Sequence, residues 1–454
     1  MKPNSKLTLT ISELGADGDG VAFVNANFPV YVFGTIPGDV VDVEVTEPHK
    51  SFARAKLNKI RKFSNLRVKP KCNLFDVCGG CQIQQMDYKA QLIFKNNKVK
   101  KNLDSVLLSG DYQMFDTLGC GNVYRFRNKA LIPFAKNSDG KIVAGFFAKG
   151  SHEIVDCQDC MIGVEENRII QKIVKEHLID FNIEPYNEVL HQGVFRYLQI
   201  RKAFATNELM VSLIVNSDSI AGETELVNKL VTLLPNIKDI SILPNKENTN
   251  VIKGREFRSV FGNGFITDFI GKIKFKISPL SFYQVNPLQT KVLYSKALEF
   301  ANLSGNETVF DLYCGVGTIS LFLAKSAKKV FGVEIIPQAI NDANENAEIN
   351  GINNTEFICG KAEEVIPQLI EKQHVTADVV VVDPPRKGCD KSLLETIVMM
   401  KPKTMVYVSC DSSTLARDVK FLTDNGFELT KVQPVDMFPH SVHIETVAQL
   451  KLKM

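Results

Sequence analysis

The chain has 454 residues and a net charge of +3, with 23% charged and 44% hydrophobic residues. This length allows about two to four domains with substantial cores, and the composition is that of an ordinary soluble protein. No apolar run approaches the length of a membrane span, and the first residues lack the apolar core of a signal peptide. We therefore expect a cytoplasmic protein without a membrane segment, whose ten cysteines are reduced thiols or metal ligands.

Residues 1–62 are predicted to be all-β. Apolar and polar residues alternate over Leu7–Ile11, as in a half-buried strand. Further strands are expected at 21–24, 28–33 and 39–45, separated by glycine-containing turns. Several short strands in about sixty residues are typical of a small barrel of the oligonucleotide-binding (OB) type. The segment resembles a TRAM domain, an RNA-binding barrel.

The exit of this predicted barrel is strongly basic. Residues 50–71 contain nine Lys or Arg residues and no acid. Such a run is either a solvated basic face or a surface that contacts a polyanion, and the sequence alone favours the two about equally.

Three cysteines follow within ten residues: Cys72, Cys78 and Cys81. In a reducing compartment this spacing indicates a metal centre, with a fourth ligand from Cys157 or Cys160 further along the chain. Cysteine pairs at both ends would suit a structural zinc site, and three clustered thiolates plus a distant one suit a 4Fe-4S cluster equally well. The spacing does not decide between the two metals.

Residues 84–278 mix helices and strands. A basic helix is expected at 86–103, and strands are expected between 195 and 215 and at 270–277. The segment 124–130 interleaves aromatic residues with cations, as nucleic-acid surfaces often do, although long side chains lying along a strand edge would give the same pattern.

From residue 308 the pattern becomes regular α/β. Residues 308–318 predict a strand followed by a glycine turn, with a helix at 319–327, and the strand 329–334 ends in Glu334. Glycines let a ligand approach the backbone, and an acid about 20 residues downstream can hold ribose hydroxyls. The turn lacks the third glycine of the dinucleotide fingerprint, which favours S-adenosylmethionine over NAD.

Three more predicted strands lead to candidate functional groups. The strand 377–382 ends in Asp383, Pro384 and Pro385, and Arg386 stands where methylases of exocyclic amines carry an aromatic residue. The strand that precedes Cys410 places this thiol at the edge of the sheet where ligands bind. A cysteine there is either a nucleophile or a small apolar residue that ends the strand. The last strand is expected to run antiparallel and to bring Glu445 towards the site.

Together these motifs resemble those of the RNA (uracil-5-)-methyltransferases. The combination is far more specific than any one motif, and it spans nearly the whole chain. It consists of Cys72, Cys78 and Cys81 with Cys160, Ser281–Pro287, Asp311–Gly315, Asp383–Gly388, Ser409–Cys410 and His443–Thr446. The TRAM-like segment with the cysteine cluster is more similar to the 23S ribosomal RNA enzymes than to the transfer RNA enzymes.

The resemblance implies a multidomain α/β fold. Its parts are an OB-like TRAM barrel over 1–62, a central α+β iron-sulfur domain over 63–278, and a Rossmann-like class I methyltransferase domain over 279–454. In this family residues near 85–115 pack with the catalytic domain, so the central domain is expected to be discontinuous. The implied partner is 23S ribosomal RNA, and a monomer is expected.

The resemblance also implies the reaction and its residues. The reaction is S-adenosylmethionine-dependent C5 methylation of a specific uridine, which gives 5-methyluridine. Cys410 would attack C6 of the uracil to make C5 nucleophilic, and Glu445 would then remove the C5 proton. On sequence alone His440 and His443 have more convenient pKa values for this last role. The implied cofactor-binding residues are Gln284, Tyr313, Glu334 and Asp383, and the implied ligands of a 4Fe-4S cluster are Cys72, Cys78, Cys81 and Cys160 rather than Cys157.

Three other functions compete with this one. A transfer RNA uracil-5-methyltransferase would carry the same catalytic residues. An amine methyltransferase is disfavoured by Arg386 and by the joint presence of Cys410 and Glu445. A non-enzymatic RNA-binding or RNA-folding protein with a redox-sensing cluster is disfavoured because the catalytic positions are intact.

Overall fold

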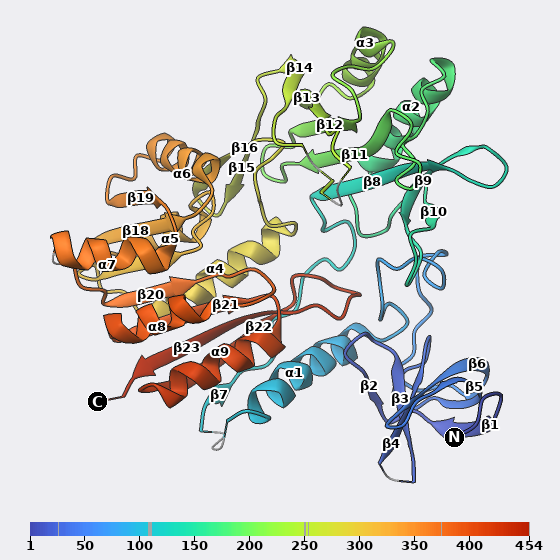
Figure 1. Ribbon diagram of the computed structural model, residues 1–454, viewed down its shortest axis with the longest axis horizontal. Coiled ribbons are helices and arrows are strands. Elements are labelled where there is room, and N and C mark those ends of the chain that lie inside the picture. The colour runs from blue at the N-terminus through green and yellow to red at the C-terminus, as the bar shows by residue number, and fades with distance from the viewer. Residues whose placement is uncertain (26, 108–110, 249–250, 253, 374, 454) are drawn as a thin grey trace.

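The computed structural model describes residues 1–25, 27–107, 111–248, 251–252, 254–373 and 375–453, and Figure 1 shows their arrangement. Residues 6–62 form a six-stranded sheet in the order β1-β5-β6-β4-β3-β2. Its two edge strands, β1 and β2, follow each other in the chain, so the sheet curls to bring its edges together around one core. The strands are β1 (Lys6–Thr10), β2 (Glu13–Leu14), β3 (Gly20–Val24), β4 (Phe28–Val32), β5 (Val40–Pro48) and β6 (Ala53–Lys62).

Strand β6 corrects one expectation. The basic run was expected to be the exit of the barrel, but its first half is a ten-residue strand of the barrel itself. Ala53 and Ala55 point into the core and Leu57 packs against it, while the cations between and after them are exposed. The alternation is inconspicuous in the sequence because two of the three inward residues are small alanines.

The middle part of the chain forms a seven-stranded sheet in the order β10-β9-β8-β11-β12-β13-β14. All its neighbours are antiparallel except β12 and β13, which are parallel and joined through α3. Helices α2 and α3 bury their apolar stripes against this sheet. The elements are β8 (Lys129–Lys136), β9 (Ile142–Phe147), β10 (Ile154–Asp156), α2 (Glu166–Asp180), β11 (Phe195–Lys202), β12 (Leu209–Val215), α3 (Glu223–Leu233), β13 (Ile237–Pro244) and β14 (Arg258–Gly262).

A two-stranded hairpin, β15 (Ile266–Ile270) and β16 (Ile273–Ile277), follows. One strand was expected at 270–277. Gly271, with a φ of 62°, instead lies at a turn inside that range. The apolar residues Ile270 and Ile273 face each other across the hairpin rather than along one strand.

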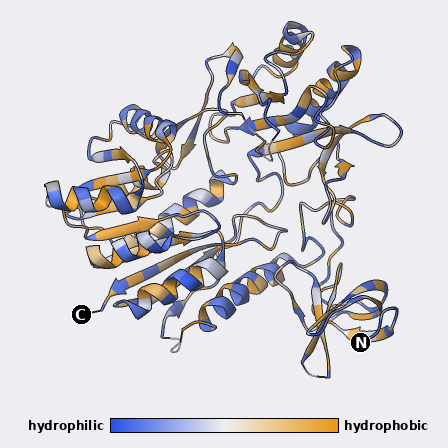
Figure 2. Cartoon of the chain, viewed as in Figure 1, coloured by the Kyte–Doolittle hydropathy of each residue, from blue (hydrophilic) through white to orange (hydrophobic). Residues whose placement is uncertain are grey.

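The C-terminal sheet has eight strands in the order β19-β18-β17-β20-β21-β23-β22-β7. Strands β17 to β21 are parallel and β23 runs antiparallel to β21, as expected. Helices cover both faces, and strand β20 is hydrophobic along its whole length (Figure 2) because it is buried on both sides. The strands are β17 (Thr308–Leu312), β18 (Lys329–Glu334), β19 (Thr355–Cys359), β20 (Val379–Val382), β21 (Thr404–Ser409), β22 (Phe427–Val435) and β23 (Glu445–Leu452).

Two hydrophobic cores sandwich this sheet. One lies under α1, α7, α8 and α9, and the other lies under α4, α5, α6 and the β15–β16 hairpin. The helices are α4 (Pro287–Ala301), α5 (Thr318–Ala324), α6 (Pro337–Ile349), α7 (Ala362–Gln373), α8 (Lys391–Met400) and α9 (Ser412–Asp424).

One helix and one strand join this sheet from the middle of the chain. Helix α1 (Tyr88–Asp104) lies beside α9, and β7 (Gln113–Met114) pairs with β22 (Figure 1). We propose the domain ranges 1–62, 63–278 and 279–454, and we propose that α1 and β7, although they lie within the second range, belong with the C-terminal sheet. None of the described helices is both long and apolar enough to cross a membrane.

Candidate active site

Four polar side chains lie at one edge of the C-terminal sheet. Asp311 is the last residue but one of β17, and Glu334 is the last residue of β18. Asp383 directly follows β20, and Cys410 directly follows β21. These strands are parallel neighbours, so their carboxyl ends meet at the same edge. This edge is the place where open α/β sheets bind ligands.

The loop after β17 is built for close approach of a ligand. Tyr313, Gly315 and Gly317 all have positive φ angles of 71°, 53° and 79°. A side chain at Gly317 would come within 2.9 Å of the Phe357 ring, so the tight turn requires glycine there. The Gly315 N–H donates to Glu334 Oε2 at 3.2 Å, which ties the loop to the end of β18.

A cleft of about 1480 Å³ opens beside this loop, large enough for a nucleoside cofactor. Tyr313, Glu334 and Asp383 line it, as does Asp311. Asp311 Oδ2 accepts from Ser320 Oγ at 2.5 Å, whereas its buried Oδ1 has no hydrogen-bond partner within the described residues. Burial raises the pKa of Asp311 to about 7.

Gln284 does not line this cleft, although its three partners in the expected cofactor set do. Gln284 is buried, and its backbone carbonyl accepts from Asn128 Nδ2 at 3.0 Å. Its neighbours in sequence, Ser281 and Phe282, line the cleft instead, and Phe282 is 70% exposed.

Cys410, directly after β21, lies close to Glu445, the first residue of β23. In the antiparallel pairing of β21 with β23, Ser409 faces Thr446, so the chain that continues from Ser409 brings Cys410 towards Glu445. Burial raises the pKa of the Cys410 thiol to about 11, with further contributions from the Glu445 and Asp383 carboxylates, while Arg386 opposes the rise. The half-buried thiol therefore has two acids and one cation around it.

Glu445 is almost completely buried, with 3% of its surface exposed. Burial raises its pKa, the neighbouring Asp383 raises it further, and Arg386 lowers it. A carboxylate with a raised pKa is a stronger base than an ordinary one. Glu445 thus combines the position and the basicity that removal of a carbon-bound proton needs.

His440 and His443 were the alternative candidates for the base, and their pKa values are lowered rather than raised. Burial lowers the pKa of His440 to about 4, and burial together with Arg386 lowers that of His443 to about 4. His440 is buried in the loop between β22 and β23, with Nδ1 3.3 Å from Gln91 Nε2. His443 contacts Arg386, at 3.3 Å from the guanidinium to Nδ1. Both are weak bases here, and this favours Glu445.

Arg386 is the group whose role sequence reasoning underestimated. It was noted only as the replacement of an aromatic residue, yet it lowers the pKa of both Cys410 and Glu445 and contacts His443. Its position directly after Asp383-Pro384-Pro385 was the available signal, because this segment ends a strand at the ligand-binding edge.

The expected cysteine ligands, Cys72, Cys78, Cys81 and Cys160, influence one another's pKa values. The pKa of Cys81 is raised to about 12 by burial and by Cys160, Cys78 and Cys72. Burial also raises the pKa of Cys78 and Cys160, and each is raised further by neighbouring thiols of the same set. Cys157 is close as well, since Cys160, Cys78 and Cys72 add to the effect of burial on its pKa. Across the described ranges, however, no three His, Cys, Asp or Glu side chains are grouped so that they could hold a metal ion.

A model of the tRNA (Uracil-5-)-methyltransferase family matches residues 87–453, and a model of the TRAM domain matches residues 2–57. The chain is 47% identical to an uncharacterized RNA methyltransferase of Clostridium tetani, covering 98% of this chain and 96% of the relative. It is 45% identical to an uncharacterized RNA methyltransferase of Listeria innocua, covering 100% of this chain and 99% of the relative.

The crystal structure of a Pyrococcus abyssi tRNA (uracil-54, C5)-methyltransferase in complex with S-adenosyl-L-homocysteine is also similar. The TM-score is 0.77 at 28% sequence identity, and the match covers 98% of this chain and 100% of the other. These comparisons confirm the expected enzyme class, the TRAM domain and S-adenosylmethionine as the methyl donor.

Proposed function

Because the chain belongs to the tRNA (uracil-5-)-methyltransferase family, we propose that it methylates C5 of a specific uridine in 23S ribosomal RNA. The enzyme is an RNA (uracil-C5)-methyltransferase. What supports the ribosomal substrate is the TRAM domain together with the four converging cysteines, a combination that resembles the 23S ribosomal RNA enzymes. Transfer RNA is the second candidate, favoured by the overall similarity to the Pyrococcus abyssi enzyme.

The observation that carries the catalytic proposal is the position of Cys410, directly after β21, beside Glu445, the first residue of the neighbouring strand β23. In the proposed reaction, the Cys410 thiolate bonds to C6 of the uracil, the C5–C6 π pair shifts to form a C4–C5 double bond, and the C4=O π pair moves onto O4. The resulting enolate is nucleophilic at C5. S-adenosylmethionine supplies the methyl group that C5 takes. Glu445 then accepts the C5 proton, the C5–C6 double bond re-forms, and the Cys410–C6 bond breaks to release the thiolate.

Three charged groups around Cys410 tune its ionisation. Because its pKa is raised to about 11, the thiol is mostly protonated near neutral pH in the free protein. Arg386 favours the thiolate, whereas an ionised Glu445 or Asp383 opposes it. Arg386 is therefore proposed to assist the attack, and the raised pKa of Glu445, which keeps part of its population neutral, lessens the repulsion.

Tyr313, Glu334, Asp383 and Gln284 are proposed to bind the methyl donor. The glycine turn and the unpaired Asp311 Oδ1 in the same cleft fit a ligand with hydroxyl and amino donors. For Gln284 the support is weaker, because only its neighbours in sequence line the cleft.

We also propose that Cys72, Cys78, Cys81 and Cys160 hold a 4Fe-4S cluster. The support is their mutual influence: each ionised thiol would repel the others in a partly buried site, and a cluster of iron ions offsets that repulsion. A cluster there would hold the segment around Cys72–Cys81 to the central sheet, and no step of the methyl transfer is assigned to it.

Mapping of 5-methyluridine decides the substrate. Ribosomal and transfer RNA from cells with and without the gene would be compared, and purified enzyme would be given unmodified transcripts of each kind. We expect one or more 23S positions to lose the modification and the 23S transcript alone to be methylated. Loss of a transfer RNA modification, with the 23S map unchanged, would replace this substrate by the second candidate.

A further inference from the structure

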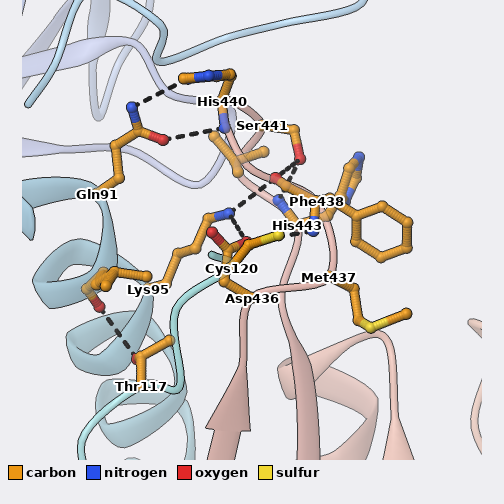
Figure 3. Close-up of polar contacts among 12 residues, drawn as sticks. Gln91, Lys95, Thr117, Cys120, Asp436, Met437, Phe438, His440, Ser441 and His443 are labelled. Atoms are coloured by element: carbon orange, nitrogen blue, oxygen red, sulfur yellow. Dashed lines mark hydrogen bonds and ion pairs between the residues drawn. The ribbon is translucent and has the colours of Figure 1, made fainter. Parts of the chain in front are cut away.

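A lysine and an aspartate form an ion pair that is completely buried. Lys95 of α1 donates to Asp436 Oδ1 at 2.5 Å, and both side chains are 0% exposed. Lys95 Nζ also donates to the Phe438 carbonyl at 2.9 Å, as Figure 3 shows. Buried charges are costly unless they are paired and hydrogen-bonded, so the fold specifies this contact closely.

Lys95 and Asp436 are 341 residues apart in the sequence. The rest of the site leaves no polar atom of the pair unpartnered. Asp436 Oδ2 accepts from Tyr88 Oη at 2.8 Å, and Asp436 Oδ1 also accepts from the Phe438 N–H at 3.2 Å. The pair therefore fixes the backbone of Asp436–Phe438 as well as the two side chains.

The side chains of α1 that make these contacts form a polar stripe. Tyr88, Gln91, Lys95, Lys98 and Asn102 recur every three or four residues, so they lie on one face of the helix. The first four contact the segment 436–442, which connects β22 to β23 and contains no helix or strand. Asn102 Nδ2 donates to Ser412 Oγ at 2.8 Å, at the start of the helix that follows Cys410. One helix face thus reaches both catalytic loops.

The segment 436–442 needs such support. His440 has a φ of 69°, a left-handed conformation that a residue with a side chain rarely adopts without being held there. Gln91 Oε1 accepts from the His440 N–H at 3.0 Å, and Lys98 Nζ donates to the Val442 carbonyl at 3.2 Å. Glu445 begins β23 three residues after Val442, so its position depends on how this segment is held.

We propose that the polar stripe of α1, centred on the Lys95–Asp436 pair, is a positioning device for Glu445. The pair holds the turn at Asp436–Phe438, and the turn sets the path of the chain into β23. The inference rests on the proposed role of Glu445 as the base that removes the C5 proton. A small displacement of a reacting group slows a chemical step by up to about 100-fold, so loosening the segment slows proton removal more than the attack by Cys410.

The test compares the double variant Lys95→Met/Asp436→Asn with the unmodified enzyme. The double change leaves no lone charge in the buried site, and it removes the Lys95 hydrogen bond to the Phe438 carbonyl, which then keeps only its bonds from Ser441. The probe is the RNA transcript that the unmodified enzyme methylates, with labelled S-adenosylmethionine, and denaturing gels follow both adduct formation and product release. We expect release to slow by about 10- to 100-fold relative to adduct formation, so that a methylated protein–RNA adduct accumulates.

Lys100→Ala is the matched control. Lys100 lies on the same helix and pairs with Asp104 at 2.8 Å, but both side chains are largely exposed. This variant is expected to keep the ratio of the two rates. If the double variant does not fold, Tyr88→Phe decides, because it removes the hydrogen bond to Asp436 together with the acceptor of the Cys120 N–H and is expected to shift the ratio in the same direction by less.

An unchanged ratio in the folded variant overturns the inference, since a merely structural contact would alter the amount of active enzyme and not the balance of steps. Glu445→Gln is measured in parallel. If it accumulates no adduct, the proposed role of Glu445 fails and the positioning inference falls with it. If it accumulates adduct while the Lys95→Met/Asp436→Asn and Tyr88→Phe variants do not, only the positioning inference fails.

Discussion

At the scale of single residues, the site is a set of acids kept in an environment that disfavours their charge. Burial and Asp383 raise the pKa of Glu445, and burial raises that of Asp311 to about 7. The sequence placed the candidate residues at strand ends but gave no information about these shifts. They arise from neighbours that are distant in the chain, such as Asp383 and Arg386 around Glu445.

The first prediction concerns the stability cost of Glu445. Its folded-state pKa is raised, so the folded protein binds the proton more tightly than the unfolded chain, and the resulting stability is lost as the pH rises through the folded pKa. Glu445→Gln removes this loss. We expect the variant to be more stable than the unmodified protein at pH 8 by about 1 kcal/mol or more, since a tenfold change in proton affinity corresponds to about 1.4 kcal/mol.

Urea unfolding at several pH values measures the difference. The advantage of the Gln variant is expected to shrink towards zero below pH ~4, where the carboxyl is protonated in both states. An advantage that is the same at pH 4 and pH 8 would show that it does not come from ionisation of Glu445.

At the scale of elements, the sequence predicted most of the strands of the C-terminal sheet and the helix at 86–103, which the structure places at 88–104. It could not assign the lysines of that helix. Lys95 is a cation in a basic sequence, yet it is completely buried because its partner lies 341 residues away. The hairpin at 266–277 and strand β6 were misjudged because a turn glycine and two small alanines weaken the usual patterns.

The second prediction concerns this buried pair. Lys95→Met leaves Asp436 without its cation, and loss of one partner of a buried pair costs roughly 3–5 kcal/mol. Chemical denaturation is expected to show a loss of this size, softened where Asp436 takes up a proton. Lys100→Ala, which breaks an exposed pair, is expected to cost less than about 0.5 kcal/mol. Similar losses in the two variants would mean that burial of the Lys95 pair contributes little.

At the scale of the whole molecule, three sheets place an RNA-binding barrel and a cysteine-rich segment beside a methyltransferase fold. In the structure, the arginines and the lysines of the basic run, residues 50–71, differ in their contacts. Arg54, Arg61 and Arg67 form ion pairs with Asp19, Asp42 and Asp39. Its lysines Lys56, Lys59, Lys62 and Lys69 form no ion pair within the described part of the chain, and the three on β6 are exposed.

The third prediction follows for RNA binding. If these lysines contact phosphates, replacing Lys56, Lys59 and Lys62 by Gln should weaken binding and reduce the salt dependence of the affinity by about 0.7 in log–log slope for each lost contact with single-stranded RNA. Binding curves at several salt concentrations give the slope. An unchanged slope would mean that the lysines only solvate this face of the barrel.

The fourth prediction concerns the cysteines. Protein purified without oxygen is expected to be brown and to hold about four irons per chain, as a 4Fe-4S cluster requires. Cys160→Ser is expected to release the iron, and Cys157→Ser, the matched control, is expected to retain it. Metal analysis that finds zinc without iron would contradict the cluster, and iron loss from the Cys157 variant alone would exchange the two ligands.

The central claim is that Cys410 and Glu445 act at different steps of one covalent reaction. Cys410→Ala cannot form the bond to C6, so it is expected neither to methylate RNA nor to attach to it. Glu445→Gln keeps the nucleophile but cannot take the C5 proton. A denaturing gel with labelled S-adenosylmethionine is expected to show a labelled protein–RNA adduct for Glu445→Gln and none for Cys410→Ala. Normal turnover by Glu445→Gln, with the adduct accumulating instead in a His440 or His443 variant, would contradict the assignment of the base.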